Sequence, residues 1–274
     1  MRLIRKILPA LALIAAFAVW QWLERRNSDT DRVCFGIPRA AEVTDIGRAA
    51  LLLHNAGFDT GYSEFFGNPL WVAYRLSPPD YPAPGSRPED GFRRDDRSLR
   101  AVGPGAFSGT GYQRGHLAPN YAMYRVHGPE AQRDSFLMTN VSPQRPRLNQ
   151  KAWQRLEEVI MDHLLPRNGP LCVLTGPVFD AAPEVLHSGV AVPAAFYKIL
   201  VTRSSRPRVL AFLVAQDVTG HEPLDLFVTT VDEIEGLTGL DFLHVLEDPI
   251  ETSIERAEPV GWGLEEVARL PPRY

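Results

Sequence analysis

Cysteine is scarce in this sequence, and the short patterns that often mark a metal or nucleotide site are missing. The only two cysteines, Cys34 and Cys172, are too few for a disulfide framework and lack zinc-site spacing. The HExxH, GxSxG, GxxxxGK and GxGxxG patterns are all absent. These absences argue against zinc peptidases, serine hydrolases and nucleotide-cofactor enzymes. Cys172 lies in an apolar run, which is typical of a small core residue. A disulfide between Cys172 and Cys34 is the alternative if the chain is in an oxidising compartment.

A surplus of positive charge is missing as well. The formal net charge is −4, so composition alone does not indicate a basic nucleic-acid-binding protein. The charge is unevenly distributed, because residues 87–155 carry 12 Lys and Arg against 6 Asp and Glu. A basic central segment in an acidic chain indicates a local anionic partner, with an ordinary solvated surface as the alternative.

One long hydrophobic run is present, at the N-terminus. Residues 7–23 contain a single polar residue, Gln21, behind the basic start MRLIRK. This length is at the short limit of about 17–25 residues for a membrane span, and a positive flank also fits an export signal. We expect residues 1–26 to form a hydrophobic helix that anchors the chain in the inner membrane. Residues 27–274 would then be one domain on the periplasmic or extracytoplasmic side. A cleaved signal peptide with secretion is the second interpretation, and a buried core helix the third.

Strand and helix patterns follow one another without regular alternation. This irregular order favours an α+β domain over a doubly wound parallel sheet. A glycine-stopped helix is predicted over residues 230–240, and apolar residues at 3–4 spacing predict an amphipathic helix over 149–165. Strands are predicted over residues 70–77, 136–142, 170–179, 194–202 and 208–216, the last two as a pair.

The stretch GYQRGHLAPNYAM, residues 111–123, places a histidine directly behind Arg114 and Gly115. A neutral imidazole accepts a proton near pH 7, and arginine offers a planar fork of donors to phosphate. His116 is therefore a candidate general base beside a candidate phosphate-binding cation. Taken alone, a histidine in a loop is more often structural than catalytic.

A second polar segment, residues 139–158, surrounds a proline turn and a helix start. Asn149, Trp153 and Glu157 are spaced i, i+4, i+8 and share one helix face, with Glu157 about 12 Å farther along the axis than Asn149. At this separation, a single ion is not easily bound directly by both Asn149 and Glu157. A hard cation such as Mg²⁺ fits if the Asn149 amide oxygen holds it and Glu157 fixes one of its waters. A helix N-cap is the structural alternative for Asn149.

Together, YQRGHLAPNYAM and FLMTNVSPQRPRLNQKAWQRLEE resemble the signature of the DNA/RNA non-specific endonuclease family. That signature combines Arg-Gly-His, Asn-x-x-Pro-Gln, Leu-Asn-Gln and Trp-x-x-Leu-Glu. LWVAYRLS, FRRDDRS, VLTGPVF and VAVPAAFYKIL also resemble family segments in the same order, so the resemblance covers about residues 33–245. It implies a mixed, mainly antiparallel sheet core with a ββα-metal finger, whose strand supplies the histidine and whose helix supplies the asparagine.

The resemblance also implies an activity and roles for single residues. The enzyme would be a Mg²⁺-dependent endonuclease, with Mn²⁺ as an alternative ion, that cleaves DNA and RNA without sequence preference. His116 would activate water, Asn149 would be the direct metal ligand, and Glu157 would hold metal-bound water. Arg114 would contact the phosphate or support the site, and Asn140 would help to shape it. Dimeric relatives make a homodimer an open expectation.

Two positions depart from the family pattern. Gln113 replaces the usual aspartate, and Met161 stands where better-known members carry an arginine that assists the phosphate. Arg145, Arg147 and Arg155 are candidates to replace that charge. The departures keep two alternatives open: a catalytically weak relative that binds nucleic acid or protein at the envelope, and a metal phosphodiesterase that acts on a non-nucleic polyanion.

Overall fold

The computed structural model describes residues 35–41, 48–83 and 86–271. The expected N-terminal hydrophobic helix, the domain boundary at residue 27 and Cys34 lie outside these residues. Within the part of the chain that is described, no helix combines the length and the apolar character needed to cross a bilayer. Cys172 is buried and disulfide-bonded.

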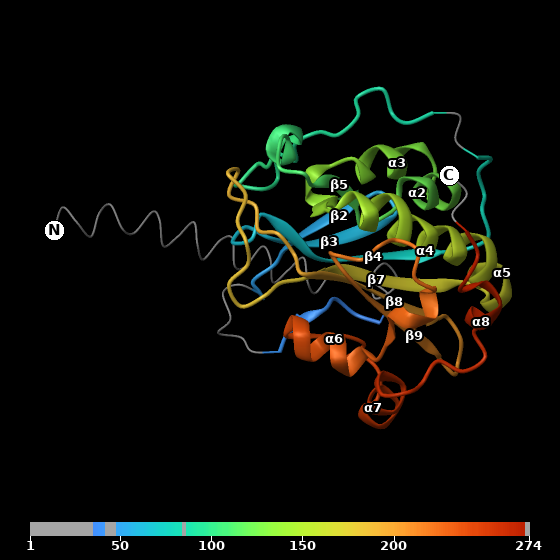
Figure 1. Ribbon diagram of the computed structural model, residues 1–274. Helices are drawn as coiled ribbons and strands as arrows, with labels where there is room; N and C mark the ends of the chain where they lie inside the picture. The colour runs from blue at the N-terminus through green and yellow to red at the C-terminus, as the bar shows by residue number, and fades with distance from the viewer. Residues whose placement is uncertain (1–34, 42–47, 84–85, 272–274) are drawn as a thin grey trace.

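A seven-stranded sheet forms the centre of the fold (Figure 1), in the order β10-β9-β8-β7-β4-β3-β2. Each neighbouring pair is antiparallel, which confirms the expected mixed fold with a mainly antiparallel core. The strands are β2 Leu51–Asn55, β3 Phe58–Ser63, β4 Asn68–Leu76, β7 Leu171–Val178, β8 Ala195–Thr202, β9 Val209–Ala215 and β10 Val228–Thr229.

Alternate side chains of the central strands enter two separate cores, as the period of two in a strand requires. Val173 of β7 joins the core on one face, together with Trp153, whereas Leu174 joins the core on the other, together with Ile234. Helices α2, α3 and α4 cover the first face, and α6 and α7 lie against the second (Figure 1). The bounds of these helices are α2 Asn120–His127, α3 Pro129–Ser135, α4 Gln154–Val159, α6 Val231–Thr238 and α7 Asp248–Glu255.

The predicted amphipathic helix is confirmed as one continuous helical segment over residues 148–168. It begins with the π-helical turn η4, Leu148–Trp153, continues through α4 and a second π-helical stretch η5, Ile160–Leu164, and ends in α5, Leu165–Asn168. Gly169 stops it with a φ of +76°. Such π-helical turns are rare and often occur at functional sites.

The predicted strands are confirmed except for the one over residues 136–142. There, Met138–Asn140 forms a short 3-10 turn, η3, and strand β6 covers Val141–Gln144. The Asn140 side chain is bonded to the backbone of Ala118 and Ser135. Ala118 is 22 residues away along the chain, so contacts made only in the folded chain hold Asn140 in a turn rather than in a continued strand.

Strand β6 pairs antiparallel with β5, Gln113–His116. Helix 148–168 is the next element after β6. This β5–β6–helix unit matches the expected ββα arrangement, with α2, α3 and η3 inserted between its strands. The glycine-rich stretch before β5 is loop, apart from the 3-10 turn η2 at Pro104–Phe107.

The predicted helix over residues 230–240 is confirmed as α6. The Thr230 hydroxyl accepts a hydrogen bond from the backbone N–H of Glu233, and Gly239 ends the helix in a left-handed conformation. The short strands β1, Arg39–Ala40, and β11, Leu240–Asp241, pair beside it. A final short helix, α8, covers Leu264–Val267.

Candidate active site

A cleft of about 760 Å³ lies where β5, the loop before it, the start of α2 and helix 148–168 meet. Four of the sequence-predicted site residues, His116, Arg114, Asn149 and Glu157, line this cleft, although they come from two separate segments. The other residues that line it include Arg87, Phe92, Tyr112, Gln113, Asn120, Tyr121, Gln150, Trp153, Gln154, Glu158 and Met161.

His116 is the last residue of β5 and faces Val141 in the ladder. Its ring is wedged between Phe92 and Phe136, with centroid distances of 5.0 Å and 4.9 Å. The Nε2 atom is buried and has no hydrogen-bond partner among the described residues. Burial, and then the positive charge of Arg87, lower the pKa of His116 to about 3. The imidazole is therefore neutral at pH 7, and no described residue occupies its Nε2 atom.

Gly115 explains why the Arg-Gly-His stretch needs glycine at its centre. The residue is paired with Ser142, and a Cβ atom at this position would collide with the Gln144 side chain. Gln144 is itself fully buried, so it has little room to retreat. The absence of a side chain here lets β5 lie close to β6 and places His116 at the cleft.

Asn149 is not a helix N-cap. It is the second residue of η4, and its Nδ2 donates a hydrogen bond of 2.9 Å to Oε1 of Gln113. This bond uses the nitrogen side of the Asn149 amide and leaves its oxygen as an available hard ligand. Gln113 thus supplies a neutral acceptor where the family pattern has an aspartate.

Glu157 forms an ion pair with a buried lysine of the sheet, Lys198, which the sequence did not indicate as a site residue. Lys198 of β8 has a side chain that is 0% exposed, and its Nζ donates a 3.0 Å hydrogen bond to Oε1 of Glu157. The same Nζ lies 4.5 Å from the ring centroid of Trp153. Desolvation raises the pKa of Glu157, and the Lys198 charge opposes that rise. Desolvation likewise lowers the pKa of Lys198, and Glu157 opposes that change.

Asn140 lies behind the cleft and is not among the residues that line it. Its side chain is fully buried; Oδ1 accepts from the Ala118 N–H at 2.9 Å, and Nδ2 donates to the carbonyls of Ala118 and Ser135. These bonds fix the chain two residues after His116. This position shapes the site from behind and gives Asn140 no contact with the cleft itself.

The turn that carries Asn140 is braced by a buried carboxylate. Oδ2 of Asp95 accepts a 2.6 Å hydrogen bond from the Thr139 hydroxyl, and Asp95 also pairs with Arg97. Burial alone would raise the pKa of Asp95, but the bonds from Arg97 and Thr139 outweigh it, so the pKa is lowered. Asp95 therefore stays ionised and ties this loop to the site.

The arginines proposed to replace the missing family arginine do not line the cleft. The Arg155 side chain is buried and donates to the carbonyl of Glu222, so helix geometry turns it away. Arg145 lies over the ring of Tyr112, at 5.9 Å, and neither it nor Arg147 lines the cleft. None of the three lines the cleft, and whether one of them compensates for Met161 stays a prediction.

Two other cations do line the cleft: Arg114, as predicted, and Arg87, which was missed. Arg114 donates to the carbonyl of Pro104 at 2.8 Å and lies over the ring of Phe92, at 4.9 Å. Arg87 lies in the Pro-rich loop before Phe92, and no local pattern distinguishes it from other surface arginines. Met161, by contrast, presents an apolar surface to the cleft.

The ligand atoms in the cleft fit a hard divalent cation. The candidate ligands are oxygens: the Asn149 amide oxygen, whose orientation Gln113 sets, and the Glu157 carboxylate about two turns farther along the same helix face. Mg²⁺ and Mn²⁺ prefer such oxygen ligands, and Mg²⁺ keeps several of its waters. Among the described residues that line the cleft there is no cysteine and His116 is the only histidine, so these residues do not assemble a zinc-type ligand set.

Comparison with known proteins identifies relatives at three levels. The pattern of the family described as DNA/RNA non-specific endonuclease matches residues 38–248. A nuclease of Nostoc sp. is 32% identical over 234 residues, which cover 80% of this chain and 83% of the relative. Mitochondrial endonuclease G of Homo sapiens is 32% identical over 190 residues, covering 64% of this chain and 63% of the relative. A chain of the solved EndoG/EndoGI complex matches 85% of this chain and 97% of its own length, with a TM-score of 0.71 at 21% identity, a similarity of fold.

Proposed function

This chain belongs to the DNA/RNA non-specific endonuclease family and is therefore a nuclease that hydrolyses phosphodiester bonds, and we propose that it does so at the cleft between β5 and helix 148–168. The observation that carries the assignment is the convergence of His116, Asn149 and Glu157 on one cleft from segments far apart in sequence. A simple binding surface has no need of this combination. We propose DNA and RNA as substrates, cleaved without sequence preference with the help of Mg²⁺, or of Mn²⁺ in its place.

His116 acts as the general base in this proposal. Its neutral imidazole takes a proton from water, the water oxygen attacks phosphorus, and the bond from phosphorus to the 3′ oxygen breaks. The leaving oxygen takes a proton from solvent, so the products carry 5′-phosphate and 3′-hydroxyl ends. A bound phosphate adds negative charge beside the imidazole and raises its pKa from about 3, which makes it a stronger base when substrate is present.

Asn149 and Glu157 would hold the divalent ion, Asn149 directly through its amide oxygen and Glu157 through a water. When bound, the ion supplies positive charge against the phosphate and its leaving oxygen. Gln113 accepts a hydrogen bond from the Asn149 amide nitrogen and so directs the Asn149 oxygen away from itself. Lys198 holds the Glu157 carboxylate in place. In this proposal Asn149 and Glu157 hold the ion, and Gln113 and Lys198 orient these two side chains.

Arg87 and Arg114 would contact the phosphates on either side of the scissile bond. Arginine binds phosphate oxygens through a planar fork, and contacts to the backbone carry no base information. Tyr112 and Tyr121 also line the cleft and offer flat surfaces to unstacked bases of any identity. This lining supports cleavage without sequence preference.

A direct test uses residues 27–274 with plasmid DNA and with a structured RNA, in Mg²⁺ or EDTA. We expect His116→Ala and Asn149→Ala to abolish cleavage of both substrates while the melting temperature stays near that of the unaltered protein. His163→Ala is the matched control, because His163 is exposed on the same helix and does not line the cleft. Full cleavage in EDTA would exclude the metal role, and full activity of His116→Ala would exclude the base.

The location of the enzyme is a separate proposal. We propose that residues 1–26 anchor the domain at the inner membrane, with the cleft outside the cytoplasm, or that they are removed on secretion. The disulfide at Cys172 is consistent with an oxidising compartment. Fractionation of cells that produce the full chain, followed by protease treatment of intact spheroplasts, distinguishes the two. Light scattering of the purified domain tests whether it forms the homodimer expected from its relatives.

A further inference from the structure

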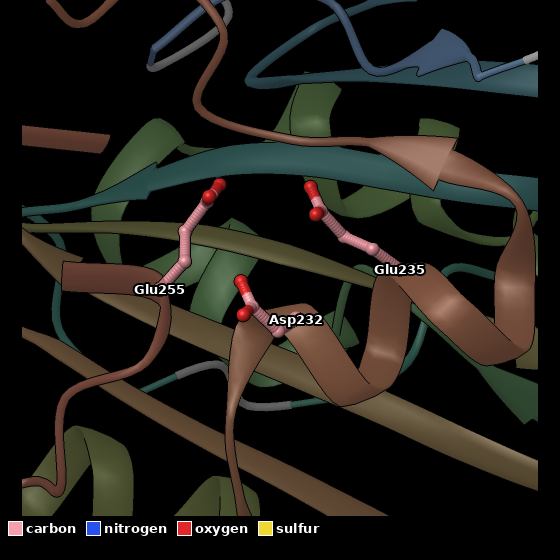
Figure 2. Close-up of side chains that lie close together, drawn as sticks. All are labelled: Asp232, Glu235 and Glu255. Carbon is pink, nitrogen blue, oxygen red and sulfur yellow. The ribbon is translucent and has the colours of Figure 1, made fainter. Parts of the chain in front are cut away.

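A cluster of three carboxylates lies on the face of the sheet opposite the nuclease cleft (Figures 1 and 2). Asp232 and Glu235 belong to α6, and Glu255 is the last residue of α7. One carboxylate oxygen from each residue lies within 4.8 Å of those from the other two. Like charges at this separation repel strongly unless a proton or a cation lies between them.

Glu255 adds an independent observation to this proximity. Its side chain is only 6% exposed, and Oε1 is buried without a hydrogen-bond partner among the described residues. Figure 2 shows its carboxyl group directed from α7 toward Asp232 and Glu235. A buried carboxylate oxygen without a partner carries a large desolvation cost, so its position indicates that something positive or hydrogen-bonding completes it.

Among the described residues, the groups that contact the cluster leave Oε1 of Glu255 uncompensated. Arg256 donates through Nε to Oδ2 of Asp232 at 2.7 Å, and the backbone N–H of Phe242 donates to Oε1 of Glu235 at 2.7 Å. Each bond occupies one oxygen of its carboxylate and leaves the second oxygen available. Neither bond reaches Glu255.

The surroundings increase the negative potential at this point. Burial, and then the charge of Glu235, raise the pKa of Glu255 to about 8, and Glu251 and Asp241 add to the rise. Burial also raises the pKa of Glu235 to about 7.

We propose that Asp232, Glu235 and Glu255 form a calcium-binding site that joins α7 to α6. Calcium takes oxygen ligands at 2.3–2.6 Å, so two oxygens bound to one ion lie at most about 5 Å apart, and the cluster oxygens, all within 4.8 Å of one another, meet that limit. Magnesium demands near-ideal octahedral geometry and usually keeps several waters, so a site that brings three carboxylates to one ion favours calcium. The half-buried Asp232 and Glu235 leave one side open for water ligands. The site is separate from the nuclease cleft and would stabilise the C-terminal part of the chain.

The test measures calcium binding in an Asn149→Ala background, which removes the proposed metal ligand of the cleft. Metal-stripped protein is titrated with CaCl₂ while its melting temperature and bound calcium are measured, the latter by equilibrium dialysis. At a calcium concentration 100-fold above Kd we expect a rise in melting temperature of about 5–10 °C and one ion bound per chain. Adding Asp232→Asn, Glu235→Gln and Glu255→Gln together should abolish both effects.

A charge-matched control replaces one aspartate and two glutamates that are exposed elsewhere, as Asp225→Asn, Glu258→Gln and Glu265→Gln. This control should keep the calcium-dependent rise. The proposal is overturned if the Asn149→Ala protein shows no calcium-dependent rise and binds no ion in dialysis, or if the cluster variant binds calcium as the control does. Since dialysis reports binding independently of melting, a change in the stability of the variants does not hide the result. MgCl₂ at the same concentration should give a smaller rise.

Discussion

Replacement of Lys198 by methionine tests how the metal-side carboxylate is held. Lys198 is fully buried, and its Nζ lies 3.0 Å from Oε1 of Glu157. Methionine retains most of the aliphatic volume over the Trp153 ring and removes the charge together with the N–H donors to Glu157 and Tyr74. Breaking a buried ion pair by removing one partner typically costs about 3–5 kcal/mol when the other partner stays ionised.

Glu157 can avoid part of that cost by taking up a proton. Desolvation already raises its pKa, and the Lys198 charge is the largest influence that lowers it. Without Lys198 the pKa rises further, so more of the carboxyl is protonated at pH 7. A protonated Glu157 is a poor acceptor for a metal-bound water. We therefore expect kcat/KM to fall by about 10–100-fold at pH 7, mainly through a raised Mg²⁺ requirement, the range typical of outer-shell partners of a metal.

The assay measures initial rates on a fluorogenic DNA oligonucleotide against Mg²⁺ concentration between pH 6 and pH 9. Activity of Lys198→Met should recover in part as pH rises, because a higher pH ionises Glu157 again. The double variant Lys198→Met, Glu157→Gln should regain stability relative to Lys198→Met without regaining activity. Lys151→Met, a partly exposed lysine outside the cleft lining, serves as the charge-matched control. An unchanged Mg²⁺ dependence in Lys198→Met, or a double variant no more stable than the single one, would refute the reasoning.

Two further predictions follow from the site. Met161→Arg adds a cation to the cleft and should raise kcat/KM several-fold at low salt, an effect that Met161→Gln should lack; equal rates for both variants would show that charge is not limiting there. Asp95 has a lowered pKa, so its stabilising contribution is present above its unfolded pKa, about 3.9, and is lost as pH falls below it. Asp95→Asn should lower the free energy of unfolding by about 1–3 kcal/mol at pH 7, with a smaller difference near pH 3 in urea titrations; an equal difference at both pH values would contradict this account.

The sequence alone predicts the local elements well, because their signals are local. The continuous apolar run of β7 is typical of a buried strand, and the 3–4 spacing in helix 148–168 arises from the geometry of a single helix. The strand predicted over residues 136–142 was wrong because contacts distant in sequence decide the structure there. Asn140 bonds to backbone at Ala118 and Ser135, and the first of these partners is distant in sequence.

Three residues of the candidate site can likewise be identified from the sequence. His116, Asn149 and Glu157 stand in recognisable motifs, and the spacing of the latter two predicts a shared helix face. Sequence does not show that Gln113 would orient Asn149, since β5 and the helix meet only after β6 has paired.

The tertiary structure alone decided which charges reach the site. Arg155 stands in the motif-bearing helix yet turns away, whereas Lys198, in an apolar strand, reaches Glu157 from the sheet face that the helix covers. The same is true of Glu255, which meets Asp232 only because α7 folds back against α6. Periodicity specifies which face of an element a residue occupies, but the packing of one element against another determines what that face meets.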